Sequence, residues 1–379
     1  MSTIKASNIQ NGSSSSVNIE LNTDGSATCA QIPVGPSSFL RNKIINGAME
    51  IDQRNNGSSV TPTADSSYTL DGWAIRNFSG SGRFSVQRQT SITPANFSYA
   101  VGLTVTTADS SNSSTYSFEQ RIEGYNLAGL GFGFTNSNYI TISFWVRSSI
   151  TGTYCLAIRD RNATYSYISE YSINVANEWE NKKITIPTLA AGEWNVANFI
   201  GMFVDFALGS NSARETTAGA WQTGNFIGTS NQVEWIANSG ATFYLTGVQI
   251  EAGFVQTPFE RRLYPQELAI CQRYCVVYGG DDLYERIALG QAIGSGTAQL
   301  LIFLPQEMRA VPSFTTSGNF ILLNAGGSGQ AVTGFSIDRA SRKILQFVAT
   351  CASGLVAGYA TQVTANNSLA SRFIVSAEL

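Results

Sequence analysis

The sequence of 379 residues contains no histidine. Histidine is the most common general base near neutral pH and the most common side-chain ligand of transition metals. Its absence excludes hydrolases built on a Ser-His-Asp or Cys-His arrangement, and zinc sites other than those with cysteine or carboxylate ligands. We find no catalytic motif in the rest of the chain. We therefore expect no enzyme activity, no bound metal and no cofactor.

Charged residues are scarce, at 13% of the sequence, against about a quarter in a typical soluble domain. Lysine and arginine number 23 and aspartate and glutamate 26, which gives a net charge of −3. Binding to nucleic-acid phosphates requires several clustered basic side chains. Because no such surplus is present, we do not expect nucleic acid to be a partner.

Long apolar runs are also missing. No stretch is long and apolar enough to span a membrane, and the opening residues MSTIKASNIQNGSSSS lack the apolar core of a signal peptide. We expect synthesis in the cytoplasm without membrane insertion. The five cysteines are few and scattered. Cys271 and Cys275 are four residues apart and could form half of a metal site, but no second pair has ligand spacing, so core packing is the expected role.

The residues that are abundant indicate a β protein, with 11% aromatic residues and 35 glycines. From Asn42 to Glu251 short apolar runs alternate with turn signals. They predict strands at Ala100–Thr106, Tyr116–Ile122, Tyr139–Arg147, Thr153–Arg159, Lys182–Pro187, Phe199–Leu208 and Phe243–Ile250. This number and spacing of strands is typical of a jelly roll or related β-sandwich.

The stretch Ala241–Cys275 joins this domain to the rest of the chain. Gly253 and Pro258 end the last strand, and a short helix is predicted from Pro265 up to the Gly279-Gly280 pair. A smaller β-sandwich is predicted beyond it, with one hairpin formed by residues 335–338 and 343–349. The predicted fold class is therefore all-β, divided into an N-terminal β-hairpin attachment segment (1–40), a jelly-roll domain (41–258), a linking helix (259–280) and a C-terminal β-sandwich (281–379).

The N-terminal segment contains two short alternating runs, Val17–Leu21 and Ala27–Ile32, on either side of an Asp24-Gly25 turn signal. An isolated hairpin is marginally stable in water. We therefore expect it to dock on another protein or on sister copies. The alternative is that it packs on its own sandwich.

The candidate site centres on the strand at Tyr139–Arg147. Its apolar residues alternate with Thr141, Ser143, Trp145 and Arg147, so that Trp145 lies on the polar face. Such a tryptophan can stack on a sugar ring while charged neighbours bind the hydroxyls. Other strands contribute Glu119, Arg121, Arg159 and Asp205, and a groove for carbohydrate is predicted if all these strands share one sheet. The alternative is that a loop or a neighbouring subunit covers Trp145, with Arg147 and Glu119 in ion pairs at the rim.

Three further sequence patterns give weaker evidence for a functional site. Asp281, Asp282 and Glu285 form an acidic cluster that could cleave a glycosidic bond, although solvated turn carboxylates are far more common. Asp71 could bind a structural calcium ion. The glycines of LAGLGFGF do not precede a helix, so a dinucleotide-binding loop is rejected.

Two stretches also carry a family resemblance: NKIINGAMEIDQRN at Asn42–Asn55 and FYLTGVQIEAGFVQTPFERRLYPQELAICQRY at Phe243–Tyr274. Together they resemble a module of tail-fibre and other virion proteins of tailed bacteriophages. The resemblance implies a jelly roll similar to carbohydrate-binding domains, located in the virion and usually homotrimeric. It implies contacts with other virion proteins through the N-terminal segment, and attachment to a glycan on the host surface.

Three alternatives remain open at this point. The chain could be a capsid decoration or tail-scaffold protein that binds only other virion proteins. It could degrade glycans, in which case two carboxyl groups should face each other across a cleft. A secreted lectin is disfavoured because no signal peptide is evident.

Overall fold

The computed structural model describes residues 41–379, apart from residues 78–79, 112, 136–137 and 326–328, together with three short strands before residue 41. These strands are β1 (Asn8–Ile9), β2 (Ile19–Leu21) and β3 (Ala27–Cys29), and they form an antiparallel sheet in that order. β2 pairs with β3 through Ile19–Cys29 and Leu21–Ala27, which confirms the predicted pairing. The turn predicted at Asp24-Gly25 lies outside the described residues.

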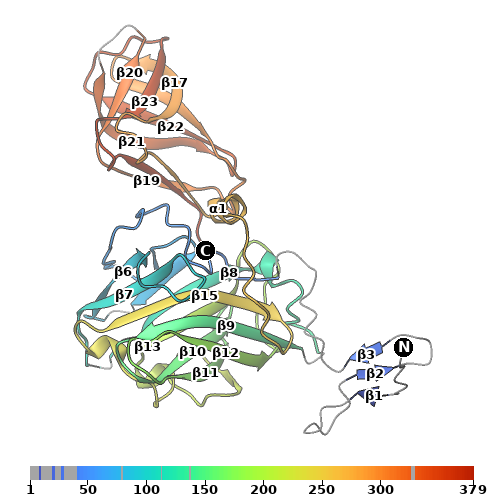
Figure 1. Ribbon diagram of the computed structural model, residues 1–379. Coiled ribbons are helices and arrows are strands. Elements are labelled where there is room, and N and C mark those ends of the chain that lie inside the picture. The colour runs from blue at the N-terminus through green and yellow to red at the C-terminus, as the bar shows by residue number, and fades with distance from the viewer. Residues whose placement is uncertain are drawn as a thin grey trace, which may run out of the picture.

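A two-sheet β-sandwich follows (Figure 1). One sheet has seven strands in the order β14 (Trp221–Thr223), β11 (Tyr165–Ile173), β10 (Gly152–Asp160), β13 (Ile200–Gly209), β8 (Tyr116–Glu123), β5 (Trp73–Asn77) and β4 (Ser67–Tyr68). The other has five, in the order β12 (Glu180–Pro187), β9 (Tyr139–Ser148), β15 (Thr242–Ala252), β7 (Ala100–Thr107) and β6 (Arg83–Gln89). Short 3₁₀ turns lie at Gly124–Leu127, Ser212–Arg214 and Trp235–Ala237. All the strands predicted for this domain are present, and the antiparallel two-sheet architecture is confirmed.

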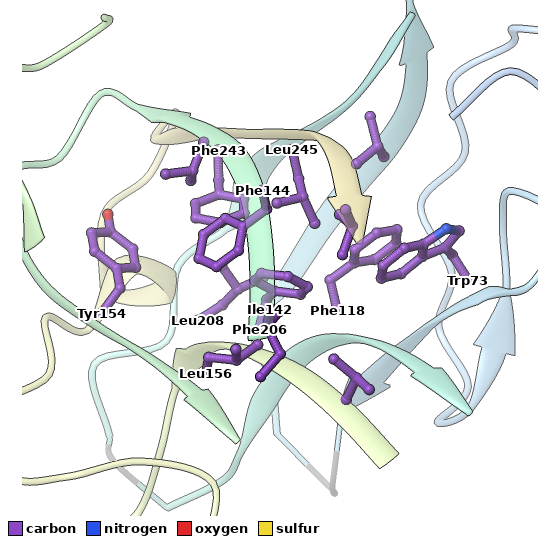
Figure 2. Close-up of a cluster of buried hydrophobic side chains, with 14 of the residues drawn as sticks. Trp73, Phe118, Ile142, Phe144, Tyr154, Leu156, Phe206, Leu208, Phe243 and Leu245 are labelled. Atoms are coloured by element: carbon purple, nitrogen blue, oxygen red, sulfur yellow. The ribbon is translucent and has the colours of Figure 1, made fainter. Parts of the chain in front are cut away.

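The alternating residues of these strands meet between the two sheets (Figure 2). Trp73 stacks on Phe118 with ring centroids 5.0 Å apart, and Phe144 of the five-stranded sheet meets Phe206 of the other sheet edge-on at 5.0 Å. Core packing of Trp73 is thus confirmed. At about 25 cal/mol per Å² of buried apolar surface, aromatic residues such as these supply much of the burial energy.

The two stretches that carry the family resemblance contact each other, although about 200 residues separate them in the sequence. The backbone N–H of Asn42 donates to Glu260, and the backbone N–H of Asn46 donates to Glu267 at 2.5 Å. The guanidinium of Arg262 donates to the carbonyl oxygens of Asn42 and Ile44. The motif is therefore one folded unit.

Helix α1 (Tyr264–Gln272) begins as predicted, with Pro265 in its first turn, where no intrahelical N–H is needed. It ends earlier than predicted. Residues Cys275–Tyr278 form strand β16, which pairs with β24 (Arg372–Ser376), so the prediction of helix up to Gly279 was wrong. Both Cys271 and Cys275 are buried, and no group of three or more potential metal ligands occurs among the described residues.

The C-terminal domain is all-β, but it is not a simple sandwich. Six strands close into a barrel in the order β17 (Arg286–Gly294), β18 (Thr297–Phe303), β22 (Ile344–Cys351), β21 (Gln330–Ala340), β20 (Phe320–Asn324) and β23 (Ala360–Ala365). A three-stranded sheet of β16, β24 and β19 (Ser313–Ser317) lies beside it. The predicted hairpin is the β21–β22 pair. A cluster of phenylalanines fills the space between barrel and sheet, with Phe314 stacked on Phe373 at 5.0 Å.

Helix α1 spans nine residues, and in the described part of the chain no helix combines the length and apolar character that crossing a bilayer requires.

Candidate functional site

The predicted site residues lie on two different sheets. Trp145 and Arg147 belong to β9 in the five-stranded sheet, whereas Glu119, Arg121, Arg159 and Asp205 belong to β8, β10 and β13 in the seven-stranded sheet. Both groups alternate with core residues, so they face outward on opposite sides of the sandwich. The single groove predicted for all six side chains is therefore not formed.

The four residues of the seven-stranded sheet form an ion cluster. Arg159 donates to both carboxylate oxygens of Asp205 at 2.8–3.0 Å, and Arg121 donates to Glu119 at 2.8 Å. Asn225 accepts from Arg159 at 2.9 Å, and the ring of Phe203 lies 4.6 Å from its guanidinium. Such bidentate pairs are the strong class of ion pair.

Burial of this cluster is nearly complete, since Glu119 and Asp205 have no exposed surface and Arg159 has 2%. Burial, and then the proximity of Asp205, raises the pKa of Glu119 to about 7. Glu119 does not lie at a rim of the face that carries Trp145, as one alternative required, because it is buried on the other sheet beside Arg76, Arg121 and Arg159. The cluster is therefore buried and paired within the protein, and it does not offer its charges to a ligand.

The outer face of the five-stranded sheet has a different character. Trp145 is half-buried and lies opposite Thr246 on β15 and Asn181 on β12. Arg147 lies opposite Tyr244, with its guanidinium 5.6 Å from the centre of the tyrosine ring. The ring of Trp179, just before β12, is 6.3 Å from that of Tyr244. This face thus carries three half-exposed aromatic rings, one of which, Tyr244, lies against Arg147.

Gly247 extends this set of rings. It has φ +63°, and a Cβ atom there would lie 2.6 Å from the ring of Phe97 and 3.1 Å from that of Trp145. The two rings therefore occupy the space above the glycine, whose left-handed conformation a larger residue would strain. Phe97 also meets Phe259 at 5.2 Å. We call the half-exposed rings of Phe97, Trp145, Trp179, Tyr244 and Phe259 the aromatic face. The loop that carries Phe97 thus contacts Trp145 but leaves its ring half-exposed. The alternative in which a loop covers Trp145 is therefore confirmed only in part.

Polar side chains border these rings. Gln89 and the ring of Tyr244 meet above Gly102, where a Cβ atom would lie 2.9 Å from each. Asn181 and Lys183 of β12 project on the same side as Trp145, because they pair with Trp145 and Ser143 of β9. Rings flanked by amides and a cation are the groups that bind sugar faces and sugar hydroxyls.

Sequence reasoning identified Trp145 and Arg147 of this face, but it did not find the other rings. Tyr244 lies in a strand that was predicted, and it alternates with the core residues Phe243 and Leu245, which is the signal that could have placed it. Trp179 lies just before its strand and Phe97 lies in a loop. Neither residue belongs to an alternating pattern from which its position could be predicted.

The remaining candidates have structural roles. Asp71 accepts from the backbone and side-chain N–H groups of Gln53, which occupies both of its oxygens. Glu285 accepts from the backbone of Gly279 and Asp281, and Asp282 accepts from the backbone of Tyr284. Glu285 and Asp282 thus stabilise a turn, which agrees with the interpretation of this cluster as turn carboxylates rather than catalytic groups.

A cleft of about 450 Å³ lies where α1 meets both domains, and Tyr99, Tyr264 and Asp52 are among its lining residues. The Asp52 carboxylate already accepts from the backbone of Asn55 and Gly57. This acid of the cleft therefore holds a turn of its own chain segment.

Comparison with known proteins identifies no family. No family model matches the chain, and no curated protein matches it. Among solved structures, the enzymatically active domain of tailspike protein 4 from bacteriophage CBA120 matches over 56% of this chain and 21% of its own, at 14% identity and a TM-score of 0.32. The match thus spans about a fifth of the tailspike chain.

Two carbohydrate-binding modules match over most of their own length. A family 61 module, solved with β-1,4-galactotriose, is covered to 97% at 13% identity and a TM-score of 0.28. The family 22 xylan-binding domain of Xyn10C from Paenibacillus barcinonensis is covered to 97% at 10% identity and a TM-score of 0.24. Similarity at this level establishes neither a family nor a ligand for this chain.

Proposed function

We propose that this protein binds glycans without cleaving them, and that the aromatic face is its binding surface. The observation that carries the proposal is that Trp145, Tyr244 and Trp179 are half-exposed rings at the outer face of the five-stranded sheet, with Arg147 against the ring of Tyr244. Rings on a sheet are held in place before the ligand arrives, which lowers the entropy cost of binding.

The rings would stack on the apolar faces of sugar rings, while Asn181, Gln89 and Arg147 bind the hydroxyl groups. The face is the outer side of a sheet, and a surface of this kind suits a polysaccharide better than a small molecule, which is normally enclosed in a pocket. A single such site binds weakly. Several copies presented together would bind tightly through their effective concentration.

The test is a glycan array probed with the purified chain and with two variants. Trp145→Ala removes a ring of the aromatic face. Tyr125→Ala removes a ring that is 58% exposed on the 3₁₀ turn after β8, away from that face. We expect Trp145→Ala to lower affinity by about tenfold or more, as the loss of one stacking contact implies. Tyr125→Ala should bind like the unmodified chain, and equal binding by all three proteins would refute the proposal.

We further propose that this binding serves attachment of a tailed-phage particle to its host, as part of a tail fibre or tail-associated protein. Its support is the sequence resemblance of Asn42–Asn55 and Phe243–Tyr274, which form one packed unit. The N-terminal segment would contact other virion proteins, and the assembly would be a homotrimer. Mass measurement in solution tests the trimer. A monomer would instead favour the alternative of a capsid decoration protein.

Glycan cleavage is the second candidate function. Glu170 and Glu215 both line a hollow of about 520 Å³ rich in threonine and serine. Each carboxylate already accepts a hydroxyl hydrogen bond, Glu170 from Thr229 and Glu215 from Ser210. We expect no oligosaccharide to be released from any polysaccharide that binds. If the unmodified chain releases oligosaccharides and the Glu170→Gln variant does not, the function is cleavage rather than binding alone.

A further inference from the structure

Two cations at the aromatic face have no acidic partner among the described residues. The central strands β12, β9 and β15 contain three basic residues, Lys182, Lys183 and Arg147, and two acidic ones, Glu180 and Glu251. Lys182 pairs with Glu180 at 2.6 Å. Glu251 is 2% exposed and accepts from Thr257 and Gln249. Arg147 and Lys183 therefore have no acidic partner on these strands.

Arg147 has no ion pair and no hydrogen bond among the described residues. Its Nε atom is buried without a hydrogen-bond partner, and the guanidinium is held against the ring of Tyr244. A buried donor left unsatisfied costs free energy, because it has lost its contacts with water. The two Nη atoms are not among the buried atoms, so a ligand carboxylate would accept from them, beside the ring of Tyr244.

Resting on proposed glycan binding at this face, we infer that the preferred ligand is an acidic polysaccharide whose sugars carry carboxylate groups. The fixed fork of an arginine matches a carboxylate in geometry as well as in charge. Arg147 binds the carboxylate of the sugar that stacks on the neighbouring rings. Lys183, exposed on the next strand, attracts the carboxylate of an adjacent sugar.

The experiment measures binding to uronate-containing polysaccharides and to the same polymers after their carboxyl groups have been reduced to alcohols. Polygalacturonate, alginate and hyaluronate are the probes, each paired with its reduced, neutral form. We expect the acidic form to bind at least tenfold more tightly, with an affinity that falls as salt is added, because exposed charges are screened. Equal or tighter binding of the reduced polymers would overturn the inference.

Two arginine variants test whether the preference for acidic polymers depends on Arg147. Arg147→Gln keeps a hydrogen-bonding side chain but removes the charge, and it should reduce the preference for the acidic form by about tenfold, equal to about 1.4 kcal/mol. Arg161→Gln is the matched control, because Arg161 also lies over a ring, that of Phe199 at 5.0 Å, but outside the face. An unchanged preference in Arg147→Gln would contradict the assignment.

The result separates this inference from the function on which it rests. If Trp145→Ala weakens binding of acidic and reduced polymers equally while Arg147→Gln has no effect, glycan binding stands and selection of acidic sugars falls. If none of the polymers binds and Trp145→Ala changes nothing on the array, the proposed function fails as well.

Discussion

At the scale of single residues, the same side-chain type serves two purposes on the two faces of the sandwich. Arg159 has three hydrogen bonds to Asp205 and is almost fully buried, whereas Arg147 has none and is half-exposed. Removing a buried charge from its partner is costly, since the partner remains without compensation. Stability therefore depends on Arg159, and ligand selection is proposed to depend on Arg147.

Asp205→Ala should lower the free energy of unfolding by about 3–5 kcal/mol, because it removes the bidentate partner of the buried Arg159 guanidinium and leaves Glu119 as its acidic neighbour. Urea denaturation measures the change. The control is Asp281→Ala at an exposed turn, for which the change should stay within about 0.5 kcal/mol. A loss below about 1 kcal/mol in Asp205→Ala would show that the cluster contributes little.

At the scale of elements, the sequence predicted which residues of a strand point inward more reliably than which strands are neighbours. Ile142, Phe144 and Val146 are buried as their alternation indicates. Alternation does not reveal the sheet to which a strand belongs, so the sequence leaves open whether Trp145 and Glu119 share a face, and opposite sheets carry them. Short strands such as β4 and β14 have too few residues for a period to be detected.

The end of helix α1 shows a second reason why the sequence did not predict every element correctly. Leu268, Cys271 and Cys275 fit a helical stripe, yet Cys275 begins a strand because its backbone pairs with Ser376, about 100 residues later in the chain. Long-range pairing of this kind overrides local preference. In the candidate site the same limit applies, since Phe97 reaches Trp145 through a loop with no regular pattern.

Glu123, at the end of β8, links this element to the residues after α1. Arg273 donates to its carboxylate at 2.6 and 2.8 Å, and the hydroxyl of Tyr274 also donates to it. Burial alone would raise the pKa of Glu123, but these hydrogen bonds outweigh it and the pKa is lowered. A lowered pKa means that the folded state binds fewer protons than the unfolded state. The stabilisation is thus present above the unfolded pKa, about 4.5, and is lost as the pH falls through the folded pKa.

The pH prediction compares the unmodified chain with Glu123→Gln. The unmodified chain should be the more stable of the two at pH 7, by about 1–3 kcal/mol for charge-assisted hydrogen bonds, and the difference should shrink towards pH 3. Urea denaturation across this range gives both curves. A difference that stays constant, or that grows in acid, would contradict the assignment.

At the scale of the whole molecule, polar contacts fix the C-terminal domain to the sandwich, and the last residues return to the junction (Figure 1). Arg309 donates to the carbonyl oxygens of Asn198 at 3.0 Å, of Ala377 at 2.9 Å and of Glu378 at 2.6 Å. Arg54 pairs with Glu378 at 2.7 Å. Each domain has its own core, so these contacts decide whether the two move as one body.

Arg309→Ala should loosen the junction without unfolding either domain. We expect calorimetry to resolve separate transitions for the two domains in the variant, and scattering in solution to show a larger maximum dimension than for the unmodified chain. Arg342→Ala is the control, since Arg342 pairs with Glu307 on the exposed side of the C-terminal domain. Identical scattering from Arg309→Ala and the unmodified chain would show that the other contacts at the junction, such as Arg54–Glu378, suffice.

The most direct test of the account is a crystal structure of the chain with an acidic oligosaccharide bound. The account predicts a sugar ring stacked on Trp145 or Tyr244, with its carboxylate on the guanidinium of Arg147. An ordered sugar in the cleft beside α1 or in the hollow at Glu170, with none on the five-stranded sheet, would contradict it.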